Sequence, residues 1–173
     1  LKTYLNPMTE ELRSSGVRIF EDWTNNSPGF KFNEWEMKGV PLRMEVGPRD
    51  IKEEKVVLVR RDSKEKLFIS KDSVLENIQE LLEDIQENLL RQARNFRDEN
   101  THAVQDYTEF KEVIKQGGFV RCGWNGDSKV EAKIKEETKA TVRCIPFNEN
   151  PQGLTWIKTG EEAKHEVIFA KAY

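Results

Sequence analysis

The residues best suited to chemistry lie in one run, residues 28–50, where aromatic, acidic and basic side chains alternate. An aromatic ring can stack on an unpaired base, and an arginine can donate to the acceptor edge of guanine. A glutamate can accept hydrogen bonds from guanine N1–H and N2–H₂. Single-stranded RNA loops are recognised with this set of groups. The same composition suits an ordinary surface above a Trp and Met core, and on composition the two interpretations are equally good.

Patterns typical of catalytic or metal sites are absent from the sequence. His102 and His165 belong to no ligand or triad pattern, so we expect structural or solvent-exposed roles for both. The sequence has no phosphate-binding loop, no G-x-G-x-x-G and no G-x-S-x-G. Cys122 and Cys144 have apolar neighbours on predicted strands, which favours buried, reduced thiols over nucleophiles. Without a signal peptide, these cysteines indicate a cytoplasmic protein.

Composition describes a polar chain without a strong bias toward nucleic acid. It has 173 residues, is 36% hydrophobic and 34% charged, and carries a net charge of −3. That length fits one α/β domain or two small ones, and no apolar run approaches the ~18 residues of a membrane span. Residues 31–66 contain ten Lys or Arg and eight Asp or Glu. If the chain binds RNA, this modest excess predicts a few specific contacts rather than a dense basic face.

The elements that must position residues 28–50 follow from periodicity and turn signals. Residues 8–15 read as the end of a helix and 17–20 as a strand. Residues 32–38 are predicted to form a short helical turn. Strands are predicted at 41–46, 55–61 and 67–69, with Gly47 and Pro48 as a break between the first two. A capping box from Ser73 to Glu76 begins a long helix whose apolar residues recur to 96, which we expect to pack on a sheet rather than in a coiled coil.

A second unit begins past residue 100. Helices are predicted at 107–116 and 128–138, strands at 119–122, 141–147 and 165–172, and a loop at 148–155. Alternating helices and strands in both halves indicate two small α/β domains, at 1–98 and 99–173. Because the chain starts at Leu1 rather than Met, we expect it to be a fragment.

Several runs in order along the chain resemble prolyl-tRNA synthetases of the archaeal and eukaryotic type, a class II family. The most specific are K-G-V-P-x-R-x-E-x-G-P-x-D at 38–50 and F-A-K-A-Y at 169–173; 56–62, 133–138 and 143–147 agree with them. The resemblance implies a mixed-sheet anticodon-binding domain at 1–98, lacking its first strand, and the family's compact C-terminal domain at 99–173.

By motif position, the resemblance assigns the contacts around the anticodon to Phe32, Glu36, Arg43, Asp50 and Lys66. Lys66 is the weakest match, because the turn at 62–66 varies in length. The implied target is the pair of guanines at the second and third anticodon positions of proline tRNA. The carboxylate of Tyr173 is expected near the active site of the full-length enzyme.

The resemblance places ATP and Mg²⁺ in a catalytic domain that this chain lacks, so the chain alone is expected to be non-catalytic. The expected partners are proline tRNA and that catalytic domain, in a cytoplasmic homodimer with no membrane contact. Many members bind zinc through W-C-G-x₃-C…C-x₂-C. The matching positions here are Asn125, Val130, Trp156 and Thr159, which offer no thiolate, so we predict no zinc and packing by Val130 and Trp156 instead.

A different class of function stays open. The chain could be a stand-alone protein-interaction or regulatory module that reuses the synthetase fold and no longer reads tRNA. A class II catalytic domain encoded upstream of Leu1 would discriminate against it. No residues in the sequence support a third possibility, an independent hydrolase.

Overall fold

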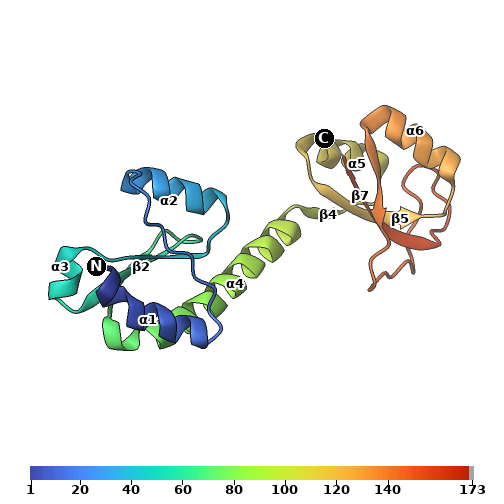
Figure 1. Ribbon diagram of the computed structural model, residues 1–173. Coiled ribbons are helices and arrows are strands. Elements are labelled where there is room, and N and C mark those ends of the chain that lie inside the picture. The colour runs from blue at the N-terminus through green and yellow to red at the C-terminus, as the bar shows by residue number, and fades with distance from the viewer. Residues whose placement is uncertain (172–173) are drawn as a thin grey trace. The chain divides into compact units, whose positions relative to one another are not determined.

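The computed structural model describes residues 1–171 and divides into two compact units, Leu1–Gln92 and a second from Ala93 onward (Figure 1). The division falls inside the long helix α4, Val74–Glu99, and the predicted boundary at residue 98 lies further along the same helix. Both units are mixed α/β with one sheet each, which confirms the fold class predicted from the sequence. Tyr173 lies outside the described residues.

The first unit is a three-stranded antiparallel sheet between helices. Its strands, β1 Leu42–Glu45, β2 Lys55–Arg60 and β3 Lys66–Ser70, lie in the order β1-β2-β3. Helices α1 (Lys2–Ser14) and α4 lie on one side of the sheet, and α2 (Pro28–Met37) lies on the other (Figure 1). The central strand β2 is buried from Val56 to Arg60, because both of its faces are covered.

The register of this sheet decides which residues share a face. Arg43 pairs with Val59, which pairs in turn with Lys66. Since directly paired residues of antiparallel strands project to the same side, Arg43 and Lys66 share one face, with one strand between them. The alternate residues, among them Leu42 and Leu58, belong to the apolar core with Leu12, Val74 and Ile78.

A buried ion pair fixes the turn after β2 to α4. Arg60, 9% exposed, donates from Nε and Nη2 to the two carboxylate oxygens of Asp62, at 3.0 and 2.7 Å. Arg60 also pairs with Asp84, and Asn88 donates to Asp62 at 2.7 Å. These bonds hold the pKa of the Asp62 carboxyl well below its usual range, chiefly through Arg60. The turn that presents residues 63–66 is therefore anchored at its start.

The second unit is a four-stranded sheet in the order β4-β5-β7-β6, with two helices. Strands β4 (Thr101–Ala103) and β5 (Phe119–Trp124) are parallel; β7 (His165–Lys171) is antiparallel to β5 and to β6 (Ala140–Cys144). Helices α5 (Tyr107–Gln116) and α6 (Ser128–Thr138) begin at the side-chain caps of Asp106 and Asp127. Phe110, Trp156 and Phe169 are fully buried and form the aromatic centre of the core.

Several local predictions were wrong. Residues 17–20 are extended but pair with no strand among the described residues; Val17 and Ile19 instead line a cleft beside β1. The predicted break at Gly47 and Pro48 does separate β1 from β2, but it also opens a short helix that was not predicted, α3 (Pro48–Lys52). The strand expected at 141–147 ends at Cys144.

The predicted capping box also fails. The Ser73 hydroxyl donates to the carbonyl of Ser70, and a 3₁₀ turn, Lys71–Ser73, leads into α4 in its place.

The two cysteines differ, although both were expected to be buried. Cys122 is buried on β5, and burial raises the pKa of its thiol to about 12, so it is not a nucleophile at neutral pH. Cys144 is exposed at the end of β6. His102 is exposed and His165 is half-buried beside Glu149, its Nδ1 3.3 Å from Oε2. Within residues 1–171, no helix is long and apolar enough to cross a membrane.

Candidate nucleic-acid interface

Arg43 stands at the centre of a polar cluster on the α2 side of the first sheet. Its guanidinium carbon lies 3.8 Å from the centroid of the Phe32 ring. Its Nε donates to Glu45 Oε1 at 2.9 Å, and its Nη1 donates to Glu36 Oε1 at 3.1 Å. Three of the five residues expected at the anticodon, Phe32, Glu36 and Arg43, are thus in direct contact.

Local sequence explains how α2 presents Phe32 and Glu36. The helix starts at Ser27, whose side chain accepts from the amide of Phe30, and Pro28 fits the first turn. Phe32 and Glu36 are four residues apart and therefore share one face. After the helix, Gly39 adopts a φ of 83°, which an L side chain rarely adopts, and the chain turns back into β1.

The preceding segment holds α2 in place. Asp22 accepts a hydrogen bond from Trp35 Nε1 at 2.8 Å and pairs with Lys31 at 3.4 Å. The ring of Phe20 contacts Trp35, with centroids 4.2 Å apart. Hydrogen bonds from Thr24 and Trp35 hold the pKa of the Asp22 carboxyl well below its usual range. Trp35 therefore serves as the anchor of the helix, while Phe32 and Glu36 are left to face Arg43.

The electrostatics of the cluster keep an acceptor and a donor side by side. Glu36 Oε2 accepts from Lys64 Nζ at 2.6 Å, while its other oxygen accepts from Arg43. These two bonds, that of Lys64 first, lower the pKa of Glu36 below its usual value. Glu36 is thus ionised at neutral pH and acts only as an acceptor. Its side chain is 33% exposed and that of Arg43 19%, so a ligand can reach both.

A cleft of about 1040 Å³ opens beside this cluster. Phe32, Glu36, Arg43 and Asp50 all line it, together with apolar residues of α1, α2 and β1. Asp50 Oδ2 accepts from the amide of Gly47 at 2.7 Å, so this carboxylate also caps α3. Four of the expected site residues therefore line the same cleft.

Lys66 is placed differently from the other four. It is exposed at the start of β3, on the same face as Arg43, and does not line the cleft. The lysine that reaches Glu36 is Lys64, from the turn before β3. Lys64 and Glu45 were missed by the sequence reasoning. Glu45 could have been found, because it lies two residues from Arg43 within the same motif; Lys64 had no comparable signal.

The four positions that the family resemblance aligns with zinc ligands carry other side chains in this structure. Asn125 Nδ2 donates to Glu161 Oε2 at 2.7 Å, and the Thr159 hydroxyl donates to the same oxygen at 3.2 Å. Trp156 is fully buried, and Val130 packs partly buried against the same core. Among residues 1–171, no group of three or more His, Cys, Asp or Glu could hold a metal ion. The donor set does not fit zinc, and Glu161 links two of the four positions.

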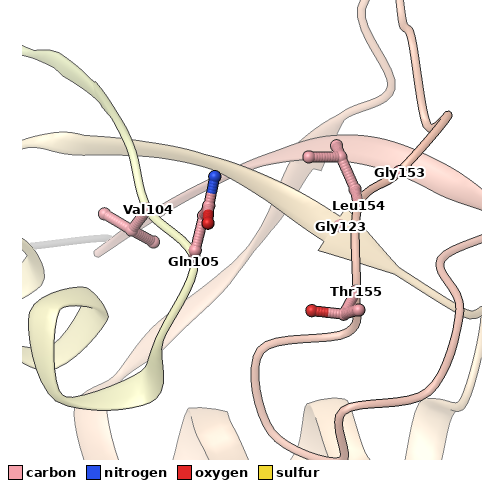
Figure 2. Close-up of a pocket in the computed structure, with 6 residues that line it drawn as sticks. All are labelled: Val104, Gln105, Gly123, Gly153, Leu154 and Thr155. Atoms are coloured by element: carbon pink, nitrogen blue, oxygen red, sulfur yellow. The ribbon is translucent and has the colours of Figure 1, made fainter.

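A small cavity of about 30 Å³ lies in the second unit and is shown in Figure 2. Val104 and Gln105 lie on one side of it, and Gly123, Gly153, Leu154 and Thr155 lie on the other (Figure 2). That volume accommodates one water molecule and no larger ligand.

Comparison with known proteins agrees with this division into two units. Residues 1–81 match the family described as "Anticodon binding domain", and residues 107–173 match "Prolyl-tRNA synthetase, C-terminal". The chain belongs to the prolyl-tRNA synthetase family. It carries the anticodon-binding and C-terminal domains of that family, and the polar cluster around Arg43 lies in the former.

Relatives named "Proline--tRNA ligase" match nearly the whole chain. The protein of Alkaliphilus oremlandii is 47% identical over 97% of this chain and 35% of its own length. That of Symbiobacterium thermophilum is 44% identical over 97% of this chain and 36% of its own length. The chain thus spans about a third of the length of the curated relatives it matches.

Proposed function

We propose that this chain reads the anticodon of proline tRNA on behalf of an enzyme that joins proline to that tRNA. The observation that carries the proposal is the contact of Phe32, Glu36 and Arg43 at the cleft of an anticodon-binding domain. Membership of the prolyl-tRNA synthetase family supports proline tRNA as the particular target.

The geometry of the cluster suits guanine. Guanine presents two acceptors, O6 and N7, on one edge, and the donors N1–H and N2–H₂ on its pairing edge. Arg43 supplies planar, charged donors for the first set, and ionised Glu36 supplies acceptors for the second. In the free protein the two side chains satisfy each other. A guanine that inserts between them breaks the hydrogen bond from Arg43 to Glu36 and gives each side chain new bonds to the base. Both charged groups therefore keep hydrogen-bond partners when water leaves the cleft.

The same contacts would reject adenine. Adenine carries a donor, N6–H₂, where guanine carries O6, so the Arg43 guanidinium would meet a donor instead of an acceptor. Adenine also lacks the N2 amino group that Glu36 would accept from. Discrimination therefore comes from unpaired charges left in the cleft as much as from the bonds made to guanine.

Proline activation would occur elsewhere in the enzyme. We assign ATP, Mg²⁺ and the class II chemistry to a catalytic domain outside this chain. That domain is the partner of this chain in the full-length enzyme, which we propose to be a cytoplasmic homodimer. This chain alone is proposed to form no prolyl-adenylate, which is tested by proline-dependent exchange between pyrophosphate and ATP. We also propose that the C-terminal domain functions without zinc, which the chemistry of Asn125, Val130, Trp156 and Thr159 supports.

The proposal is tested by binding proline tRNA beside the same tRNA with both anticodon guanines changed to adenine, at one fixed salt concentration. Tighter binding of the unchanged tRNA is expected. Equal binding of the two would overturn anticodon reading. In that case the family fold would serve as a protein-interaction or regulatory module, the alternative that the sequence leaves open.

A further inference from the structure

One aromatic side chain on the Arg43 face is left without an explanation. Phe68 lies on β3, and 69% of its surface is exposed. It pairs with Val57, which pairs in turn with Glu45 of the cluster. Phe68 is therefore on the same side of the sheet as Arg43 and Glu45, one rung from the row that holds Arg43 and Lys66.

The surroundings of Phe68 separate it from an ordinary apolar patch. Along β3, the residues on its face are Lys66 and Ser70, both exposed and polar. Val57, opposite it, is only 8% exposed. A protein partner would need a wider apolar surface to bury. A single flat ring beside a lysine instead fits a nucleotide, whose base stacks on the ring and whose phosphate meets the cation.

We propose that Phe68 is a base-stacking position of this interface, occupied by an unpaired base of the anticodon loop. This inference rests on the proposed function. Two strand spacings and two residues along the strand separate Phe68 from Arg43, about 12 Å in all. A base on Phe68 therefore lies too far from Arg43 to be the guanine that Arg43 contacts, and we assign it to a nucleotide beside the guanine pair. Lys66, on the same strand and face, is placed to pair with that nucleotide's phosphate.

Stacking tolerates any base, because every base has a π-face, so Phe68 contributes to affinity rather than to sequence choice. Removing an aromatic ring that stacks one base weakens binding by about 5- to 150-fold. Phe68→Ala should do so equally for proline tRNA and for a tRNA with altered guanines. Phe68→Trp and Phe68→Tyr should bind within a few-fold of the unchanged chain, since both keep a flat ring.

The test uses the 173-residue chain and anticodon stem-loop RNAs, with dissociation constants measured by fluorescence anisotropy at fixed salt. Phe96→Ala is the matched control, because Phe96 is 63% exposed but belongs to α4. A second set of RNAs lacks the base at the nucleotide on either side of the guanine pair. At one of these positions the missing base should weaken binding to the unchanged chain but not to Phe68→Ala.

The outcomes separate the two proposals. Suppose that the unchanged chain prefers the RNA with both guanines and that Phe68→Ala binds this RNA as tightly as the unchanged chain does. The stacking inference is then overturned and anticodon reading stands. If both missing-base RNAs weaken the two proteins equally, the ring stacks no base and the inference is again overturned. If the unchanged chain does not prefer the guanines, the proposed function fails and takes this inference with it.

Discussion

Removing the guanidinium of Arg43 is the most direct perturbation of the proposed guanine site. Arg43→Ala deletes two hydrogen bonds to carboxylates, at 2.9 and 3.1 Å, and the stack on Phe32 at 3.8 Å. Glu36 keeps Lys64 as a partner, so its charge stays compensated; Glu45 loses Arg43. The cleft remains lined by the same helix and strand, and the variant should fold.

The expected magnitude follows from the arginine–guanine pair that the substitution removes. One such bidentate pair contributes about 1–3 kcal/mol of discrimination, or about 5- to 150-fold in relative affinity. Arg43→Ala should therefore reduce the ratio of affinities for guanine and adenine at one anticodon position by that factor. The ratio at the other position should be largely kept.

The assay is competition binding of four stem-loop RNAs, carrying guanine or adenine at each of the two positions. Arg49→Ala is the matched control, because Arg49 also carries one positive charge but is 88% exposed and pairs with Glu53, the C-cap of its own helix. It should lower all four affinities alike, as loss of a phosphate contact would. A uniform loss in Arg43→Ala, with the guanine preference intact, would refute the assignment of Arg43 to a guanine edge.

Three further predictions concern stability. Asp62→Asn should lower the free energy of unfolding at pH 7 by about 1.5–3 kcal/mol, because it removes the charged acceptor of buried Arg60; urea melts measure it, with exposed Asp72→Asn as the control. Because folding lowers the pKa of Asp62, the stability that its carboxylate contributes is present above the unfolded value of about 3.9 and is lost as pH falls below it. The difference in unfolding free energy between Asp62→Asn and the unchanged chain should therefore shrink in acid. A difference independent of pH would contradict this explanation. Gly123→Ala should destabilise the second unit by about 1–3 kcal/mol, because the added Cβ would lie 2.6 Å from the Thr155 carbonyl oxygen. Thermal melts measure this change. Gly29→Ala is the control, because its Cβ would meet no atom within 4 Å and the melting temperature should not change. Elemental analysis should find no zinc, and chelator should leave the melting temperature unchanged; one equivalent of zinc per chain would show the interpretation of Asn125, Val130, Trp156 and Thr159 to be wrong.

The sequence predicted elements well where their signals were local. Helices α5 and α6 begin at Asp106 and Asp127, whose side chains cap the first turn, and α5 ends at Gly117 with a φ of 94°. Residues 17–20 show the opposite case. Their pattern is that of a strand, but a strand needs a partner, and no periodicity within the segment reveals whether one is present.

The packing at the four positions expected to correspond to zinc ligands was predicted in part. The burial of Trp156 and the packing of Val130 follow from apolar side chains at two of the four positions. Glu161 was not foreseen, although it accepts from both Asn125 and Thr159. Neutral amide and hydroxyl donors suit a carboxylate, and the choice among nearby carboxylates depends on the path of the loop after Trp156, which composition does not define.

The candidate interface likewise contains residues that the local sequence predicts and residues that only the tertiary fold brings to them. Phe32, Glu36 and Arg43 lie within twelve residues, so helix spacing and one turn are enough to bring them together. Lys66 and Phe68 share their face only through the pairing of β3 with β2, and Lys64 reaches Glu36 from the turn before β3. A shift of that pairing by one residue would turn all side chains of the strand to the opposite face. The sheet register thus adds to the short motif a second row of cationic and aromatic groups. This row broadens the proposed interface from a guanine cleft to a surface that also supports the neighbouring nucleotide.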